Sequence, residues 1–205
     1  MSGLNDKSEK RNLLPYDGVV QYFGPVISEN KADEYNAALS KEVAWEHDTI
    51  VMFGKRIVTK RKVAWYGDEG FTYAYSGSRK TALPWTPHLR ILKALGEEVS
   101  GETFNSCLLN YYHNGNEGMS WHSDDEAEMA PGRAIASMSL GAQRRFSFRH
   151  KSTKETVSLQ LEHGSLLVMA GETQKHWHHQ LPKSARIIGS RINLTFRVFR
   201  SATTI

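Results

Sequence analysis

The sequence predicts an α+β fold in which two N-terminal helices precede an all-β C-terminal half. Two observations lead to this prediction. Apolar residues recur at three- and four-residue steps in two segments before Thr103, which is typical of amphipathic helices. After Thr103 the helical period is lost, and short segments that alternate apolar and polar residues follow one another between turn residues. Six or more such strands indicate a sandwich or barrel, and a jelly roll is one arrangement that protects the sheet edges.

The N-terminal elements follow from local patterns. Residues 1–14 are rich in charged and small polar residues, so we expect a flexible tail there. Residues 15–205 are expected to form a single domain. Residues 28–45 predict a helix with Ser28 as its N-cap. Its apolar face is formed by Ala32, Tyr35, Leu39 and Val43.

A second helix is predicted to begin at Thr86-Pro87, because proline suits the first helical position. Between the helices, residues 49–77 are rich in β-branched and aromatic residues and are interrupted by glycines, which favours short strands and turns. The later strand segments are SCLLNYYH, AIASMSLG, RRFSFRH, ETVSLQLEH, GSLLVMAG and SRINLTFRVF.

Composition excludes several classes of protein. The 205 residues are 40% hydrophobic and 23% charged, which is ordinary for a globular domain. The sequence contains neither an apolar run of about 20 residues nor the apolar stretch of a signal peptide, so we expect an intracellular protein that does not enter membranes, cytoplasmic if bacterial and nuclear if eukaryotic. The single cysteine, Cys107, excludes internal disulfides and cysteine-based metal sites. A bound metal must therefore be held by histidine and carboxylate.

Basic residues gather between Gly54 and Val63, whereas acidic residues gather near Asp124. The basic cluster could neutralise several phosphates, which indicates nucleic-acid binding. A solvated surface explains the charges equally well when they are considered alone.

The string Trp121-His122-Ser123-Asp124 places an imidazole and a carboxylate two residues apart, hence on one face of an extended chain. A further histidine is available from the distant string His176-Trp177-His178-His179. Two histidines and one carboxylate form the facial triad of non-haem Fe(II) oxygenases. A lone His-x-Asp is more often a surface or hydrogen-bonded pair.

The last strand carries Arg191, Asn193, Thr195 and Arg197 on one face and apolar residues on the other. Arginines on a buried strand are costly unless carboxylates or other anions meet them. The alternative is an exposed polar face. Asn110 and Tyr112 repeat the two-residue spacing on an earlier strand and could contact a small polar cosubstrate.

In this order, these motifs resemble the AlkB family of Fe(II)- and 2-oxoglutarate-dependent nucleic-acid dealkylases, especially the animal-type members that act on DNA. The resemblance covers about residues 15–200 and rests on VMFGK, PWTP, HSDDE, AIASMSLG, HGSLLVM and RINLTFR. It implies a double-stranded β-helix (jelly-roll) core at 103–200 and a nucleotide-recognition lid at about 49–80. It also implies a metal held by His122, Asp124 and His179, with His176 and His178 as alternatives to His179. The implied 2-oxoglutarate ligands are Asn110, Tyr112, Arg191, Asn193, Thr195 and Arg197.

The resemblance also implies substrate-binding residues. Tyr73 and Tyr75 correspond to an aromatic lid over a flipped base, and Phe53 corresponds to a finger that fills the gap left in the duplex. Arg61 corresponds to a phosphate or backbone contact, although a proline often found at the position of Lys60 is absent. Asp125 and Glu126 follow the metal carboxylate, where an acidic residue suits a cationic methylated base. Each aromatic residue could instead be a packing residue.

The activity implied by the resemblance is repair of DNA that carries 1-methyladenine or 3-methylcytosine. Fe(II), 2-oxoglutarate and O2 would hydroxylate the methyl group, and formaldehyde, succinate and CO2 would be released. The expected partner is alkylated DNA, duplex as well as single-stranded, and the protein is expected to act as a monomer. The alternatives are an RNA demethylase and a non-catalytic nucleic-acid-binding protein. An intact His122, Asp124 and His179 set argues against the latter, because a pure binder does not need a metal triad.

Overall fold

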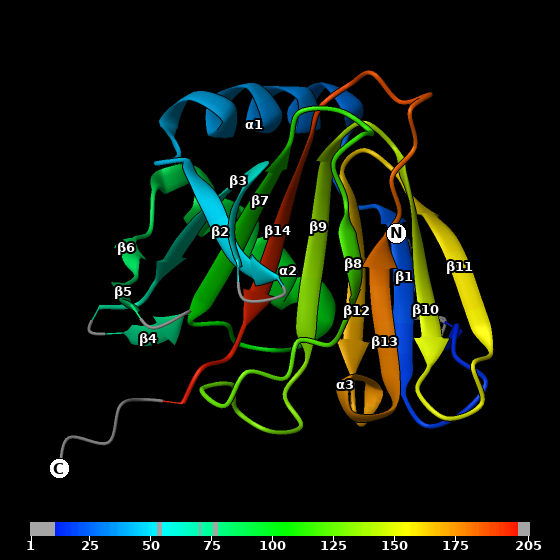
Figure 1. Cartoon of the computed structure of the whole chain (residues 1–205). Helices are drawn as coiled ribbons and strands as arrows, with labels where there is room; N and C mark the ends of the chain where they lie inside the picture. The colour runs from blue at the N-terminus through cyan, green and yellow to red at the C-terminus, as the bar shows by residue number, and fades with distance from the viewer. Residues whose placement is uncertain (1–10, 53–54, 70, 76–77, 201–205) are drawn as a thin grey trace, which may run out of the picture.

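The computed structural model describes residues 11–52, 55–69, 71–75 and 78–200. Two β-sheets face each other, and the helices α1 (Glu29–Glu42) and α2 (Pro87–Ser100) pack on the outer side of the larger sheet (Figure 1). A short helix, α3 (Thr173–His176), lies at one end of the molecule. In the described part of the chain, none of the helices is both long enough and apolar enough to cross a membrane.

The larger sheet has eight strands and is antiparallel except at one edge. Its path runs β1 (Val19–Pro25), β12 (Ser165–Ala170), β9 (Ile135–Gly141), β14 (Arg191–Arg197), β7 (Ser106–Tyr112), β3 (Lys55–Gly67) and β2 (Glu46–Met52), while β6 (Leu83–Pro84) pairs in parallel with β3.

The smaller sheet has four strands in the order β11 (Thr156–Leu161), β10 (Arg144–His150), β13 (Trp177–Leu181) and β8 (Met119–His122). A separate hairpin joins β4 (Thr72–Tyr75) to β5 (Ser78–Thr81). Two facing sheets of mainly antiparallel strands form the predicted jelly roll.

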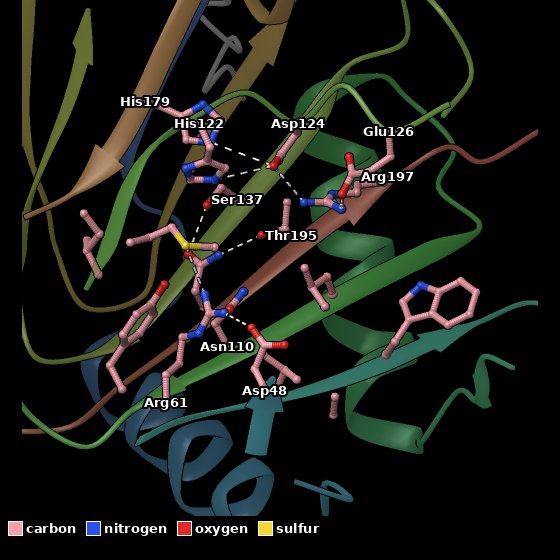
Figure 2. Close-up of a pocket in the computed structure, with 18 of the residues that line it drawn as sticks. Asp48, Arg61, Asn110, His122, Asp124, Glu126, Ser137, His179, Thr195 and Arg197 are labelled. Atoms are coloured by element: carbon pink, nitrogen blue, oxygen red, sulfur yellow. Dashed lines mark hydrogen bonds and ion pairs between the residues drawn. The ribbon is translucent and has the colours of Figure 1, made fainter. Parts of the chain in front are cut away.

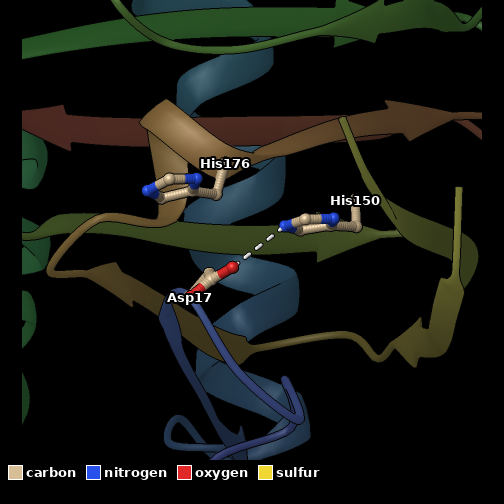
Figure 3. A group of neighbouring side chains, drawn as sticks. All are labelled: Asp17, His150 and His176. Carbon is tan, nitrogen blue, oxygen red and sulfur yellow. Dashed lines mark ion pairs between the residues drawn. The ribbon is translucent and has the colours of Figure 1, made fainter. Parts of the chain in front are cut away.

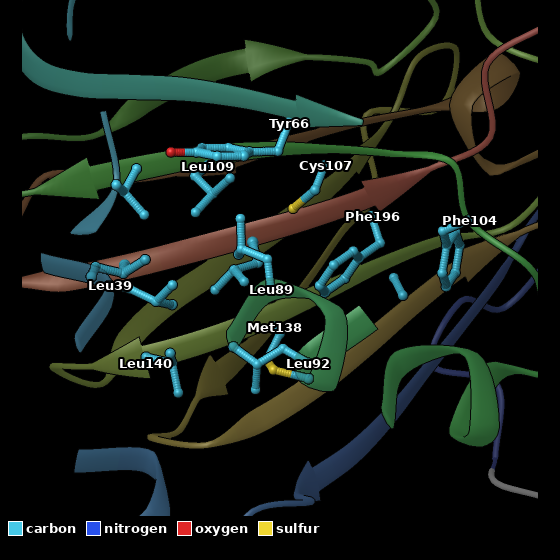
Figure 4. Packing of buried hydrophobic residues seen from close by; sticks show 14 of the residues in the cluster. Leu39, Tyr66, Leu89, Leu92, Phe104, Cys107, Leu109, Met138, Leu140 and Phe196 are labelled. Atoms are coloured by element: carbon cyan, nitrogen blue, oxygen red, sulfur yellow. The ribbon is translucent and has the colours of Figure 1, made fainter. Parts of the chain in front are cut away.

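Strand β14 shows how the sequence alternation positions the two halves of the interior. Ile192, Leu194 and Phe196 belong to the apolar cluster that also contains helix residues such as Leu39, Leu89 and Leu92 (Figure 4). The intervening polar residues of β14 face the space between the sheets. Because side chains alternate along a strand, one strand supplies both core and cavity wall.

Cys107 of β7 lies in the same helix-side cluster and is fully buried. Burial raises the pKa of its thiol well above the ordinary value. The thiol is therefore protonated and inaccessible in the folded protein.

Both predicted helices are present. Helix α1 begins after Ser28 as predicted, but the Ser28 side chain makes no capping hydrogen bond, and the helix ends at Glu42 rather than at Trp45. The Thr86 side chain accepts a hydrogen bond from the backbone N–H of Leu89, so it is the N-cap of α2. Gly101 ends α2 in the left-handed conformation, with φ of 71°, which glycine adopts at little cost.

The structure also differs from the sequence predictions in its strands and near the N-terminus. Strand β1 was not predicted, and with β2 and β3 it extends the C-terminal sheet, so the N-terminal part is not a purely helical layer. The segment 55–67 is one long strand rather than several short ones. Leu13 and Leu14 were predicted to belong to a flexible tail, but Leu14 is buried and the backbone N–H of Leu13 donates to Val20 O at 2.8 Å.

Candidate active site

A cavity of about 480 Å³ lies between the two sheets. Its walls come from the polar face of β14, from neighbouring strands of the large sheet, and from β8, β10 and β13 of the small sheet. Figure 2 shows how side chains from both sheets converge on it. All nine residues predicted to bind metal or cosubstrate therefore line one cavity.

His122, Asp124 and His179 lie together at one end of the cavity. The Nε2 atoms of His122 and His179 are 3.7 and 3.9 Å from Asp124 Oδ1, and one possible ligand atom from each residue lies within 4.8 Å of the others. The β8–β13 pairing sets His122 directly opposite His179. Asp124 follows two residues after the end of β8, so the His-x-Asp spacing brings its carboxylate to the same point.

The protonation states of these residues suit metal binding. His122 Nδ1 lies 2.8 Å from the carbonyl oxygen of Ser120, so Nδ1–H donates there and Nε2 keeps a free lone pair. Burial lowers the pKa of His179 to about 3, so its imidazole is neutral near pH 7. Burial alone would raise the pKa of Asp124, but the charges of Arg197, His179 and His122 outweigh it and the pKa is lowered.

Residues around α3 hold the Asp124 segment in place. The backbone N–H of Asp124 donates to Gln174 Oε1 at 2.9 Å, and Ser123 Oγ donates to the carbonyl oxygen of Trp177 at 3.1 Å. The same turn leads directly into β13 and His179. It thus ties the metal carboxylate to the strand that carries the distal histidine.

The geometry also separates His179 from the other two histidines. His179 is buried and faces the cavity, whereas His178 is partly exposed and does not line it, as expected for consecutive residues of a strand. His176 lies on α3, in a group with Asp17 and His150. Of the three candidates, only His179 lies with His122 and Asp124.

The two arginines of β14 have different surroundings. Arg197 lies 2.9 Å from Asp124 Oδ1 and 2.8 Å from Glu126 Oε1. Burial alone would lower its pKa, but these two carboxylates raise it. The predicted role of Arg197 was binding of 2-oxoglutarate, yet in this structure two carboxylates of the chain already neutralise its charge.

Arg191 is 2% exposed and has no carboxylate partner among the described residues. Its guanidinium donates to Ser139 Oγ at 2.8 Å and to Asn193 Oδ1 at 2.6 Å, while its Nε has no hydrogen-bond partner in the described part of the chain. Burial lowers its pKa to about 10, so it stays charged near pH 7. A buried, uncompensated guanidinium fits an incoming carboxylate.

Amide and hydroxyl groups line the space between the triad and Arg191. Asn193 Nδ2 donates to Thr195 Oγ1 at 2.8 Å, and Ser137 Oγ donates to Asn193 Oδ1 at 3.0 Å. Asn110 Oδ1 is buried without a partner among the residues that the structure describes, and the Tyr112 ring lies 5.7 Å from the Arg191 guanidinium. The residues present therefore fit both groups: two imidazoles and a carboxylate suit Fe(II), and Arg191 with its polar neighbours suits the dicarboxylate 2-oxoglutarate.

Arg61 corrects one prediction. It was predicted as a phosphate or backbone contact, but it is 6% exposed, forms an ion pair with Asp48 and donates to Met119 Sδ at 3.3 Å. Alternation along β3 explains the difference, because Lys60 is exposed while Arg61 faces the cavity. An arginine already paired and buried does not contact a surface phosphate.

Glu126 and Asp125 point to different places. Glu126 lines the cavity, its Oε1 accepts a hydrogen bond from Arg197, and its Oε2 is buried without a hydrogen-bond partner among the described residues. Asp125 is exposed and lines a neighbouring hollow instead. Of the two, Glu126 is therefore the carboxylate available to a group inside the cavity.

Of the aromatic residues predicted to contact the flipped base or the duplex, the structure describes only the backbone positions of Tyr73 and Tyr75. Phe53 lies outside the described residues. Tyr73 and Tyr75 occupy alternate positions of β4, hence one face of that strand, but their side chains lie outside the described part.

Several site residues were not found from sequence. Asp48, Met119, Ser137, Phe146 and Met169 all line the cavity, and Gln174 holds Asp124. The alternation of AIASMSLG was a usable signal for Ser137 and Ser139. No local pattern marks Asp48 or Gln174, whose partners are distant in sequence.

Comparison with known proteins gives a consistent result. Residues 19–197 match the 2OG-Fe(II) oxygenase superfamily. The DNA oxidative demethylase ALKBH2 of Mus musculus is 44% identical over 202 residues, which cover 93% of this chain and 84% of the relative. ALKBH2 of Homo sapiens is 42% identical, with 82% of this chain and 68% of the relative covered.

The human alpha-ketoglutarate-dependent dioxygenase alkB homolog 3 is 39% identical, and the match spans 83% of this chain and 60% of that protein. The solved structure of OsALKBH1 superposes with a TM-score of 0.58 at 15% identity, covering 90% of this chain and 99% of that one, which shows the shared fold alone. The chain therefore belongs to the 2OG-Fe(II) oxygenase superfamily and, within it, to the AlkB family, whose members are dioxygenases that use Fe(II), 2-oxoglutarate and O2.

Proposed function

We propose that this chain is a DNA repair dioxygenase that oxidatively demethylates ring nitrogens of bases, with 1-methyladenine and 3-methylcytosine as substrates. One observation carries the proposal: the cavity combines the His122–Asp124–His179 triad with the unpartnered Oε2 of Glu126. Methylation of these ring nitrogens makes the base cationic, so a carboxylate beside the metal suits it. The ALKBH2 relatives, named as DNA oxidative demethylases, support DNA as the substrate.

His122, Asp124 and His179 would hold Fe(II), and Arg191 would bind one carboxylate of 2-oxoglutarate. When bound, Fe(II) and 2-oxoglutarate supply the activation of O2 by which a methyl group is hydroxylated and then lost as formaldehyde, with succinate and CO2 as the other products.

The chain's own residues place the substrate. Arg197 fixes the Glu126 carboxylate through Oε1, which leaves Oε2 free to accept a hydrogen bond from the exocyclic amine of the base. Because the same guanidinium also contacts Asp124, it couples the position of the base-facing carboxylate to that of the metal ligand.

Oligonucleotides that carry one 1-methyladenine test this function. The protein is incubated with Fe(II), ascorbate and 2-oxoglutarate, and mass spectrometry measures loss of the methyl group from single-stranded DNA, duplex DNA and RNA. We expect turnover of both DNA forms. Turnover of RNA alone would replace the proposal by an RNA demethylase, and binding without turnover on any substrate would replace it by a non-catalytic nucleic-acid-binding protein.

We also propose that the protein acts as a monomer, since this one chain supplies the triad, the cosubstrate residues and the base-facing carboxylate. Sedimentation velocity with and without DNA tests this, and a stable dimer in the active fraction would contradict it.

A further inference from the structure

A second group of possible metal ligands lies apart from the active-site cavity. Asp17, His150 and His176 each place a ligand atom within 4.8 Å of the others (Figure 3). They come from the turn before β1, the end of β10 and the end of α3. None of them lines the active-site cavity, and the proposed demethylation does not use them.

One ligand atom of this group, His150 Nε2, is buried and lacks a hydrogen-bond partner among the described residues. His150 is 4% exposed, and its Nε2 faces Asp17 Oδ2 at 3.3 Å. Two ligands of one tetrahedral Zn²⁺, each about 2.0 Å from the metal, are separated by about 3.3 Å. The pair therefore already has the spacing of two ligands on one ion.

The turn that carries Asp17 is held in a fixed position. Asp17 has φ of 52°, in the left-handed region that aspartate adopts more readily than most residues. Trp177 Nε1 donates to Tyr16 O at 3.1 Å on one side, and Val19 N–H donates to Thr173 Oγ1 at 2.9 Å on the other. These anchors to α3 and β13 set the Asp17 carboxylate beside the histidines before any ligand arrives.

The opposite edge of the His150 ring has an acceptor for its remaining proton. Nδ1 lies 3.1 Å from both the backbone nitrogen and the hydroxyl of Thr153. Without metal, the backbone N–H donates to Nδ1 and the imidazole proton is on Nε2, facing Asp17. With metal on Nε2 the proton moves to Nδ1 and is donated to Thr153 Oγ1, which also contacts the Tyr16 hydroxyl at 2.8 Å.

We propose that Asp17, His150 and His176 bind a Zn²⁺ ion that clips the N-terminal turn to the end of the small sheet. Two imidazoles and one carboxylate are a ligand set that zinc accepts, with water in the fourth position. The Asp17 and His176 side chains are 51% and 34% exposed, so ions can reach the site and the His176 ring can close the remaining distance. Because Thr153 N–H loses its acceptor, we expect weaker binding than at the His122–Asp124–His179 triad.

Zinc stoichiometry tests the proposal on the whole metal-stripped protein. Isothermal titration with Zn²⁺, checked by elemental analysis after gel filtration, should give two ions per wild-type chain and one per chain in His176→Gln and Asp17→Asn. Co²⁺ absorption provides a second measurement, because loss of the second site should remove a tetrahedral d–d band.

His163→Gln is the matched control. His163 pairs with Asp33 at 3.2 Å, a similar histidine–carboxylate distance without a second histidine, so this variant should still bind two ions. Asp124→Ala should lose the other, tighter site and retain the weaker one. Two results would contradict the proposal: one ion per wild-type chain, or two ions per chain with unchanged Co²⁺ spectra in both His176→Gln and Asp17→Asn. Either result would show that the cluster is only a hydrogen-bonded link between elements.

Discussion

Replacing Arg191 by methionine should separate two effects of its buried charge, which are the effect on the unfolding free energy and the effect on 2-oxoglutarate binding. Burial lowers the pKa of Arg191 from its ordinary value to about 10, and at about 1.4 kcal/mol per pKa unit the charge costs the folded protein roughly 3 kcal/mol. The variant regains this free energy. It also loses the contacts to Ser139 and Asn193, and an unsatisfied buried group costs about 1–3 kcal/mol. Without cosubstrate, we expect an unfolding free energy between that of the wild type and about 2 kcal/mol above it.

The effect on 2-oxoglutarate should have the opposite sign. A charge-assisted hydrogen bond is worth about 1.5–3 kcal/mol, so Arg191→Met should weaken 2-oxoglutarate binding by roughly 10- to 150-fold. Urea unfolding measures the first quantity, and anaerobic calorimetric titration with Mn²⁺ in place of Fe(II) measures the second without turnover. The 2-oxoglutarate affinity of Arg191→Lys should lie between those of the wild type and Arg191→Met, because lysine keeps the charge but not the planar guanidinium.

Arg145→Met is the control for this pair of measurements, since Arg145 is exposed on β10 and both quantities should stay at wild-type values. If Arg191→Met binds 2-oxoglutarate as tightly as the wild type, the carboxylate is bound elsewhere. A loss of more than about 3 kcal/mol in the cosubstrate-free protein would show that the guanidinium stabilises the fold, contrary to the reasoning from its burial.

Four further predictions concern the triad and the substrate contacts. Asp124→Ala should lose metal binding and turnover while oligonucleotide affinity, measured by fluorescence anisotropy, stays near wild type; a parallel loss of affinity would contradict separate sites. Glu126→Gln should reduce activity on cationic 1-methyladenine more than on neutral 1-methylguanine, whereas equal losses would make Glu126 structural. Phe53→Ala should reduce repair of duplex DNA by roughly tenfold, since a base–aromatic stack is worth about 1–3 kcal/mol and 1.4 kcal/mol is tenfold in rate. Repair of single-stranded DNA should change little. Equal losses on both substrates would exclude Phe53 as the residue that fills the gap left by a flipped base. The pKa of His179 is about 3 in the folded protein against an ordinary value of 6.5, so between these pH values the unfolded chain binds a proton that the folded protein does not. The unfolding free energy of the metal-free protein should therefore fall as the pH drops from 6.5 towards 3, by up to about 1.4 kcal/mol per pH unit. Urea unfolding measures this fall, and His179→Gln should show a shallower pH dependence.

Strand alternation allowed much of the jelly roll and its polar cavity face to be predicted. In β14, residues 191–197 alternate between the apolar cluster and the cavity as the sequence pattern indicates. The same reasoning did not identify α3, because its four residues are too few to show a helical period. It also missed β1, whose partner β12 lies far away along the chain.

The partners of the charged residues could not be predicted, because they depend on tertiary contacts. Both Arg191 and Arg197 were expected to need anions, but only the fold shows that Asp124 and Glu126 meet Arg197 and leave Arg191 uncompensated. Arg61 was misassigned for the same reason, since Asp48 lies on the neighbouring strand. The family resemblance favoured His179 over His176 and His178, but the positions of β13 and α3 were needed to show which of them lies with His122 and Asp124.

The burial of Cys107 makes the wild-type chain a convenient background for site-specific labelling. The sequence contains no other cysteine, and maleimides react with accessible thiolates, a state that this thiol does not reach in the folded protein. A cysteine introduced at Val58, which is 65% exposed on β3, would then be the sole reactive position. A fluorophore or spin label attached there would report whether strands β2 and β3 move when substrate binds, without removal of any native residue from the core.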